Sequence, residues 1–317
     1  MRLFALNTSA ALGSRIAAQL DRNLDLHEER EFSYGEHKTR PLVDVYGEDV
    51  YVVSSLHGDR NLSVNDKICR LLFFIGALKD AGAGLVTAVL PYLAYSRKDC
   101  RTKSRDPVTT RYIATVLQSI GTDRVVTMDI HNLAAFENSF RCPTVNLETT
   151  DLFADFFFRT VGDDIDTIVS PDLGGIKATQ RFLDAYSRIS GRTMHFAVMD
   201  KRRSEGRVSG SGLIGAVGKH VLIVDDMIGS GTTLCRATTA CLDAGSIGVS
   251  VGATHGLFQD GASSLFSQSG INTIVVTDTV EIERLGLPDE DLARVKIIST
   301  AHIFAQCIRD LARTIHE

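Results

Sequence analysis

Two adjacent acidic residues, Asp225 and Asp226, follow an apolar run and precede a turn rich in Gly, Ser and Thr. Glycines at 229 and 231 would let backbone N–H groups approach a phosphate at a helix N-terminus. The carboxylates suit vicinal hydroxyls, so the segment predicts a site for a phosphorylated sugar such as ribose 5-phosphate. The alternative is a plain strand-to-helix connection, but paired acids ending an apolar strand are costly without a partner. The predicted sugar-phosphate contacts are Asp225, Asp226, Gly229, Ser230, Gly231, Thr232 and Thr233.

A second segment, residues 97–105, carries five cations and one acid in nine residues. It lacks the wider basic face and interleaved aromatic residues of a nucleic-acid site, so a triphosphate, and ATP in particular, is the predicted ligand. Upstream, the ring of Phe32 can stack on adenine and Glu36 can accept from its amino group. A simple turn at Gly35 is the alternative. The predicted ATP contacts are Phe32, Tyr34, Glu36, Arg97, Lys98, Asp99 and Lys103.

Two further residues, His131 and Asp172, each follow a predicted strand. An imidazole partnered by a carboxylate can hold Mg²⁺ directly or through water, so the pair is a candidate metal site. Against this, Mg²⁺ prefers oxygen ligands and a single histidine is more often structural.

The run Lys201-Arg202-Arg203 opens a polar stretch that extends to Gly212 and predicts a mobile, positively charged flap. Cations that close over developing charge stabilise the transition state of phosphoryl transfer, so the basic residues of this flap are candidates for that role. The alternative is a solvated basic loop. A Walker A loop is missing from the sequence, which excludes the usual P-loop kinase arrangement.

Short apolar runs alternate with segments of helical period, which predicts an α/β protein with mainly parallel sheets flanked by helices. The clearest predicted strands are 3–6, 50–54, 85–90, 124–129, 167–170, 221–225, 246–252 and 273–277. The clearest predicted helices are 9–20, 65–81, 107–120, 150–161, 232–244 and 301–315.

The length of 317 residues suggests two domains, and the best boundary lies near residues 142–148. We therefore predict domains 1–147 and 148–317, with the last helix as a candidate to pack on the first domain. The ligands are expected in the cleft between the two domains.

The composition is 44% hydrophobic and 23% charged, with a formal net charge of −5. It is that of an ordinary globular protein with no global attraction for nucleic acid or an anionic membrane. No stretch is long and apolar enough to span a membrane or direct secretion. The six cysteines form no C-x-x-C pair, which indicates free thiols in a cytoplasmic protein.

Residues 225–233 resemble the ribose 5-phosphate loop of the phosphoribosyltransferase fold. Other segments resemble one family of that fold, the ribose-phosphate pyrophosphokinases, in the same order along almost the whole chain. These segments are 32–36, 95–107, 129–131, 169–175, 200–203, 253–256 and 276–279. The resemblance implies two phosphoribosyltransferase-type domains, Mg²⁺, and a homo-oligomer in which the 32–36 loop serves a neighbouring subunit. It also implies that Lys201 and Arg203 are the catalytic residues of the flap.

The resemblance further implies that the pyrophosphoryl group of ATP passes to the anomeric hydroxyl of ribose 5-phosphate and that AMP leaves. The products would be AMP and 5-phosphoribosyl 1-pyrophosphate. One alternative is a phosphoribosyltransferase that consumes this product, which would not need the 97–105 stretch. Another is a catalytically silent relative that binds nucleotide and regulates a partner.

Several positions depart from the family pattern. Gly229 stands where many relatives carry an acid, Lys98 replaces a usual Gln, and the residues after His131 lack a Gln-containing run. Asp44 and Tyr46 replace a Ser and an Arg of the regulatory phosphate site. Because an acid repels an anion, phosphate activation is predicted to be weak or absent.

Overall fold

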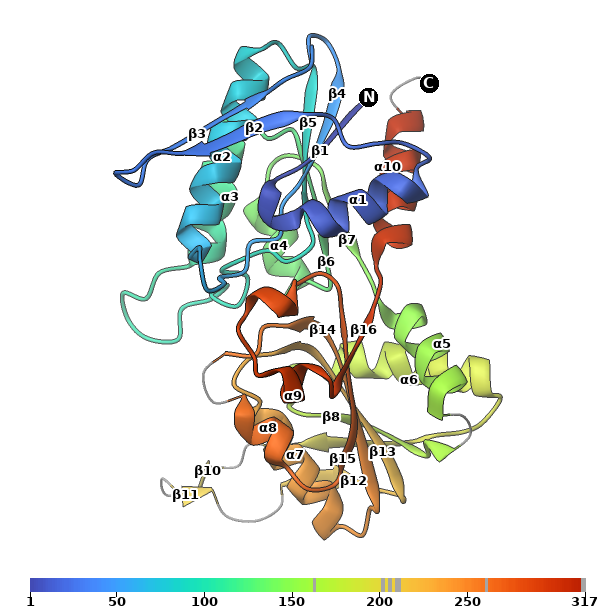
Figure 1. The fold of residues 1–317 in the computed structure, drawn as a ribbon. Coiled ribbons are helices and arrows are strands. Elements are labelled where there is room, and N and C mark those ends of the chain that lie inside the picture. The colour runs from blue at the N-terminus through green and yellow to red at the C-terminus, as the bar shows by residue number, and fades with distance from the viewer. Residues whose placement is uncertain (162–163, 201–202, 205–206, 209–211, 260–261, 315–317) are drawn as a thin grey trace. The chain divides into compact units, whose positions relative to one another are not determined.

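The chain forms two compact units in a computed structural model (Figure 1). The structure describes residues 1–317 apart from 162–163, 201–202, 205–206, 209–211, 260–261 and 315–317. Unit 1 comprises Met1–Leu147, Thr279–Arg284 and Ser299–Glu317, and unit 2 comprises Glu148–Asp278 and Leu285–Ile298. The second unit is therefore not one undivided stretch over 148–317, because the chain returns twice to unit 1, the second time with its last helix.

Unit 1 is built on a five-stranded sheet of order β1-β4-β5-β6-β7. All of its neighbouring strands are parallel, and a separate antiparallel hairpin pairs β2 with β3. The strands are β1 (Arg2–Ala5), β2 (His27–Glu31), β3 (His37–Pro41), β4 (Asp49–Val53), β5 (Leu85–Leu90), β6 (Arg124–Met128) and β7 (Thr144–Leu147). The helices are η1 (Asn7–Ser9), α1 (Ala10–Gln19), α2 (Val64–Asp80), α3 (Thr109–Ser119), α4 (Leu133–Ser139), η3 (Ile282–Arg284) and α10 (Ala301–Thr314).

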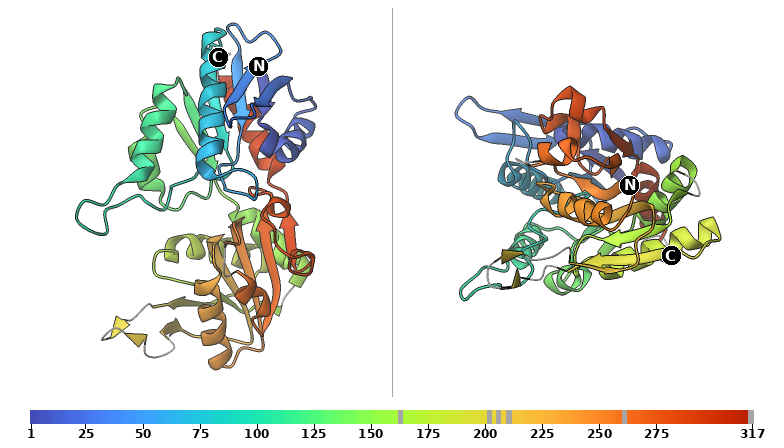
Figure 2. Two further views of the ribbon diagram at one scale, coloured as in Figure 1. Left: turned by 60° about the vertical axis from the view of Figure 1, so that its left-hand side comes forward. Right: turned by 90° about the horizontal axis from the view of Figure 1, so that it is seen from below.

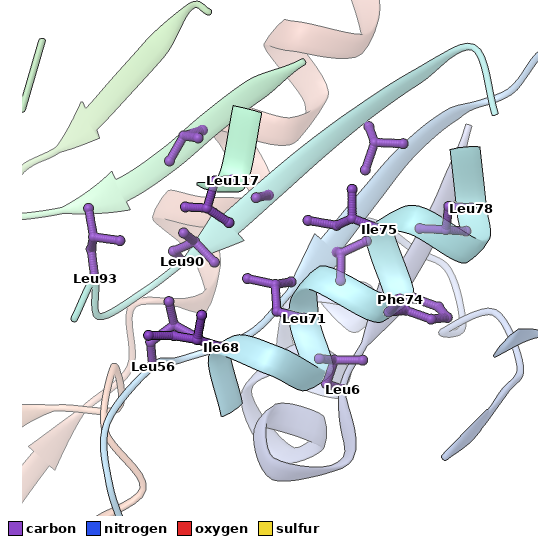
Figure 3. Packing of buried hydrophobic residues seen from close by; sticks show 14 of the residues in the cluster. Leu6, Leu56, Ile68, Leu71, Phe74, Ile75, Leu78, Leu90, Leu93 and Leu117 are labelled. Atoms are coloured by element: carbon purple, nitrogen blue, oxygen red, sulfur yellow. The ribbon is translucent and has the colours of Figure 1, made fainter. Parts of the chain in front are cut away.

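Helices cover both faces of this sheet, because alternate residues of each strand point to opposite sides. On β4, Val50 and Val52 join the cluster under α2, α3 and α4, whereas Tyr51 and Val53 join the cluster under α1 and α10. Figure 3 shows the first cluster, in which Leu71 and Ile75 of α2 pack toward the sheet. The left-hand view of Figure 2 shows the same layering from a further side.

Unit 2 contains a seven-stranded sheet of order β12-β9-β8-β13-β14-β15-β16, parallel except for the edge strand β12. The strands are β8 (Thr167–Ser170), β9 (His195–Met199), β10 (Arg203–Ser204), β11 (Arg207–Val208), β12 (Leu213–Gly215), β13 (His220–Ile228), β14 (Gly248–Gly256), β15 (Ile271–Thr277) and β16 (Val295–Ile298). The helices are α5 (Thr150–Val161), α6 (Ile176–Ser190), α7 (Thr232–Asp243), α8 (Ser263–Ser267) and α9 (Asp289–Leu292).

The predicted α/β class with mainly parallel, helix-flanked sheets is confirmed. All six cysteines are free, as the sequence indicated. Across the described residues, no helix is long and apolar enough to cross a membrane.

Candidate functional site

The predicted sugar-phosphate acids lie inside a strand rather than at its end. β13 continues to Ile228, so the predicted end at Asp225 is wrong. On one side β14 accompanies β13 as far as Ile228, but on the other side β8 pairs only with Val221–Ile223. The strand therefore passes beyond the carboxyl end of β8, and Asp172, which follows β8, interacts with the acids at that sheet edge.

Asp225 feels the charges of the two other acids at this edge, Asp226 and Asp172. Burial raises the pKa of Asp225 well above its usual value, and the negative charges of Asp226 and Asp172 raise it further. The Asp226 backbone N–H donates to Asp225 Oδ1 at 2.9 Å, and the Gly175 N–H donates to Asp172 Oδ1 at 3.1 Å. An edge this rich in acceptors suits hydroxyl donors or a cation.

The turn after β13 opens α7 as the sequence predicted. Gly231 is the N-terminal cap of α7 with φ +75°, and a Cβ there would lie 2.9 Å from Leu265 Cβ, so glycine is required. The exposed hydroxyls of Ser230 and Thr232 lie 3.0 Å apart at the helix start. At Gly229 a Cβ would meet only Gln259 Oε1 at 3.5 Å, so space does not explain the missing acid.

The predicted nucleotide stretch is a loop between β5 and α3, and an ion pair within the loop stabilises its conformation. Lys98 Nζ pairs with Asp106 Oδ2 at 2.9 Å, so the ammonium of Lys98 is already engaged inside the loop. Asp106 also accepts from Thr102 Oγ1 and from the Lys103 backbone N–H, and these bonds with that of Lys98 lower its pKa. The side chains of Arg97 and Lys103 are exposed and face solvent.

The same loop contacts the segment that carries His131. The side chain of His131 is exposed between β6 and α4. Its neighbour Asn132 donates from Nδ2 to Asp99 Oδ2 at 2.6 Å, so the structure brings together two motifs that are about 30 residues apart in the sequence. Sequence reasoning missed Asn132, although an Asn directly before a helical segment is a typical N-cap signal.

The predicted adenine-binding residues form the tip of the β2–β3 hairpin. The rings of Phe32 and Tyr34 stack with centroids 5.6 Å apart, and the Arg30 guanidinium lies 4.9 Å from the Phe32 centroid. The Phe32 N–H donates to the Glu36 carbonyl at 2.8 Å, which closes the turn at Gly35 (φ +89°). The tip therefore presents the exposed ring of Tyr34, stacked on the half-buried ring of Phe32, beside the exposed side chain of Glu36.

Comparison with known proteins agrees with both units. Residues 1–121 match the N-terminal domain of ribose phosphate pyrophosphokinase, 145–257 a phosphoribosyl transferase domain, and 206–316 a phosphoribosyl synthetase-associated domain. Ribose-phosphate pyrophosphokinase 1 of Streptococcus pneumoniae serotype 4 is 33% identical, covering 97% of this chain and 92% of that protein. The ribose-phosphate pyrophosphokinase of Caldanaerobacter subterraneus subsp. tengcongensis is 34% identical, covering 97% and 93%. The chain belongs to the ribose-phosphate pyrophosphokinase family.

A solved structure agrees with this assignment over the full length. Phosphoribosylpyrophosphate synthetase from Mycobacterium smegmatis has a TM-score of 0.85 and 28% sequence identity, and the match covers 99% of both chains. The pyrophosphokinase family thus accounts for both units.

Two of the pyrophosphokinase site predictions concern the flap. Lys201 lies outside the described residues. Arg203 lies in β10, which pairs with β11 in a two-stranded antiparallel ribbon (Arg203 opposite Val208), but its side chain is outside what the structure describes. Both residues remain predictions.

The predicted metal pair is divided between the units, with His131 in unit 1 and Asp172 in unit 2. Among the described residues, no three His, Cys, Asp or Glu side chains form a group that could hold a metal ion by themselves. Asp225, Asp226 and Asp172 do not form such a group, although their carboxylate oxygens are the donor type that Mg²⁺ prefers. Such an ion would take further oxygen ligands from substrate and water.

Proposed function

We propose that this chain transfers the β,γ-pyrophosphoryl group of MgATP to the anomeric hydroxyl of ribose 5-phosphate, giving AMP and 5-phosphoribosyl 1-pyrophosphate. The observation that carries the proposal is the pairing of Asp225 and Asp226 with the helix-opening turn at 229–231. The carboxylates accept from ribose hydroxyls while the turn and hydroxyls of Ser230, Thr232 and Thr233 hold the 5-phosphate. Family membership over the full chain supports the same reaction.

On the nucleotide side, Arg97 and Lys103 bind the polyphosphate, and Lys98 supports the loop through Asp106. Asp99 completes the stretch through its bond to the His131 loop. Binding both substrates in a fixed geometry brings the anomeric oxygen in line with the β-phosphorus, and the AMP oxygen leaves. Lys201 and Arg203 stabilise the charge that develops in this step.

Mg²⁺ bound with ATP would neutralise the triphosphate charge, and His131 and Asp172 are the residues we propose to hold it, directly or through water. The cation would also relieve the repulsion among Asp172, Asp225 and Asp226.

The exposed hairpin tip suggests how the adenine is bound. Phe32, Tyr34 and Glu36 make their turn contacts among themselves at the end of a projecting hairpin (Figure 1). We propose that this tip serves the site of a neighbouring subunit in a homo-oligomer. Phe32 and Tyr34 stack on the base and Glu36 accepts from its amino group.

An assay of AMP release tests the reaction. The protein with ATP, ribose 5-phosphate and Mg²⁺ should release AMP in equal amount to 5-phosphoribosyl 1-pyrophosphate, and omission of any one component should stop it. A phosphoribosyltransferase would instead consume 5-phosphoribosyl 1-pyrophosphate in the presence of a base and release no AMP. ATP binding without turnover would identify the regulatory relative.

The flap is tested by Lys201→Ala. Because the ammonium is proposed to act on charge that develops in the transition state, kcat should fall by about 10²- to 10³-fold while KM for both substrates changes little. Lys219→Ala is the matched control. Lys219 directly precedes β13 and its side chain is exposed, so this substitution should leave kcat unchanged. An unaltered kcat in Lys201→Ala would remove the flap from the mechanism.

A further inference from the structure

Asn132 uses both ends of its side-chain amide. It is the N-cap of α4, where its Oδ1 accepts from the Ala135 backbone N–H at 3.2 Å. Its Nδ2 donates to Asp99 Oδ2 at 2.6 Å, and a bond to a carboxylate is among the stronger hydrogen bonds in proteins. The small cap residues Ser, Thr and Asp offer the acceptor but no amide donor of this reach.

The loop on which Asn132 stands is itself fixed to the sheet. The Asp129 N–H donates to the Leu147 carbonyl at 2.8 Å, with φ +38° at Asp129, and the Ile130 N–H donates to Asn146 Oδ1 at 2.9 Å. Both acceptors belong to β7. The 129–132 loop is therefore a firm support at the carboxyl edge of the unit 1 sheet.

The nucleotide stretch, by contrast, makes its described bonds largely within itself, through Lys98, Thr102, Lys103 and Asp106. Such bonds fix the internal shape of the loop, and the Thr110 N–H of α3 donates to the Lys98 carbonyl at 3.3 Å. The bond from Asn132 to Asp99 is a second connection, and it joins the stretch to the segment that carries His131.

We infer that Asn132 is a positioning residue for the nucleotide: it orients Asp99 and holds the 97–105 stretch against the His131 loop. This inference rests on the proposed function, because the effect is read through ATP. ATP affinity depends on the donor end of the Asn132 amide, whereas the stability of α4 depends on its acceptor end.

The substitution Asn132→Asp separates the two roles. A carboxylate still caps α4, so the apparent Tm should stay within about 2 °C of the parent protein. It cannot donate to Asp99 and instead places two negative charges together, so the Kd for MgATP, measured by calorimetry without ribose 5-phosphate, should rise about five- to tenfold. KM for ribose 5-phosphate should change by less than about twofold.

Asn138→Asp is the matched control. Asn138 lies on the same helix, donates to the Ala134 carbonyl at 2.7 Å and is exposed. The substitution therefore adds the same charge to α4 without contact to Asp99, and the Kd for MgATP should stay within about twofold.

A double-mutant cycle tests whether Asn132 affects MgATP affinity through Asp99. When Asp99→Asn is already present, Asn132→Asp can accept from the new amide, so its cost in MgATP affinity should drop below about twofold. The inference is overturned if Asn132→Asp costs the same in both backgrounds, or if it leaves MgATP affinity unchanged. Failure of the proposed function is distinguishable, because the parent protein would then release no AMP.

Discussion

Asp225 carries the clearest pH dependence in the sugar-phosphate site. Burial and the charges of Asp226 and Asp172 raise its pKa above that of the unfolded chain. The folded state then holds a proton that the unfolded state releases, so the stability of the ligand-free protein falls as pH rises from the ordinary carboxyl range toward the raised pKa.

Asp225→Asn should remove this loss. The variant should match the parent protein near pH 4 and exceed it at higher pH, by on the order of 1 kcal/mol for each pH unit between the unfolded and folded pKa of Asp225. Urea unfolding between pH 4 and 8 measures the difference. Asp243→Asn, an exposed acid at the end of α7, is the control and should show no such trend. A constant difference across this range would contradict the raised pKa of Asp225.

The contact between Asp44 and Tyr46 gives a structural reason to expect weak activation by phosphate. The Tyr46 backbone N–H, which could donate to an anion, donates to Asp44 Oδ1 at 3.0 Å. A phosphate that binds this N–H would have to displace the Asp44 carboxylate, whose negative charge would repel it. Titration of inorganic phosphate into the AMP-release assay should therefore change kcat by less than about twofold, and Asp44→Ser should increase the response. A large activation of the parent protein would refute the prediction.

At the scale of elements, a buried ion network fixes the start of α2. Lys67 Nζ lies 2.9 Å from Asp59 Oδ2, and Arg284 Nε lies 3.2 Å from the same oxygen. Burial raises the pKa of Asp59, but the bonds from Lys67 and from the Asn61 and Leu62 N–H groups outweigh it and the pKa falls. The network thus joins the loop after β4, the helix α2 and the returning segment Thr279–Arg284.

Lys67→Met should cost about 3 kcal/mol of unfolding free energy, because it leaves the Asp59 charge buried with less compensation. Lys79→Met is the matched control on the same helix. Lys79 lies 2.5 Å from Asp123 Oδ2, but both side chains are partly exposed, so that pair should contribute about 1 kcal/mol or less. Urea unfolding at pH 7 measures both, and equal costs would argue against a stabilising role for the Asp59 network.

Because the Asp59 pKa is lowered, the contribution of Asp59 to the unfolding free energy should be lost as pH falls below the ordinary carboxyl range.

The sequence predicted the elements with strong local patterns and missed those that depend on distant partners. α5 lies at its predicted bounds, since its apolar period and caps are local signals. β13 runs three residues past its predicted end at Asp225, because β14 pairs with the acidic segment and stabilises it as strand. The β2–β3 hairpin was not predicted as strand, since its charged sequence at 27–31 has no apolar alternation.

The same limit applies to the site. The Gly-Ser-Gly turn and its two acids are adjacent in sequence, so their juxtaposition could be predicted. The bond between Asp99 and Asn132 joins two loops on different strands, and no spacing rule predicts it. The Lys98–Asp106 pair could have been expected from opposite charges in one loop, but which cation would be engaged depends on the loop conformation.

At the scale of the whole molecule, the path of the chain makes unit 1 depend on its last helix. Phe304 and Ile308 of α10 are completely buried, and Ala301 and Ala305 are nearly so. They belong to the cluster with Leu3, Leu12, Ile16 and Tyr51 on one face of the sheet. A fragment ending at 147, the predicted first domain, would expose this face to water.

The fragment 1–147 should therefore fail to unfold cooperatively. Loss of two fully buried large side chains alone removes about 3–6 kcal/mol of apolar burial, a large share of the 5–15 kcal/mol that stabilises a typical domain. Joining residues 299–317 to the fragment through a flexible linker should restore a sigmoidal urea transition, whereas the same extension with Phe304→Asp and Ile308→Asp should not. Both fragments lack Thr279–Arg284, so the comparison isolates α10. If fragment 1–147 alone unfolded at the same urea midpoint as the extended one, α10 would be dispensable to unit 1, and the burial of Phe304 would contribute nothing to its stability.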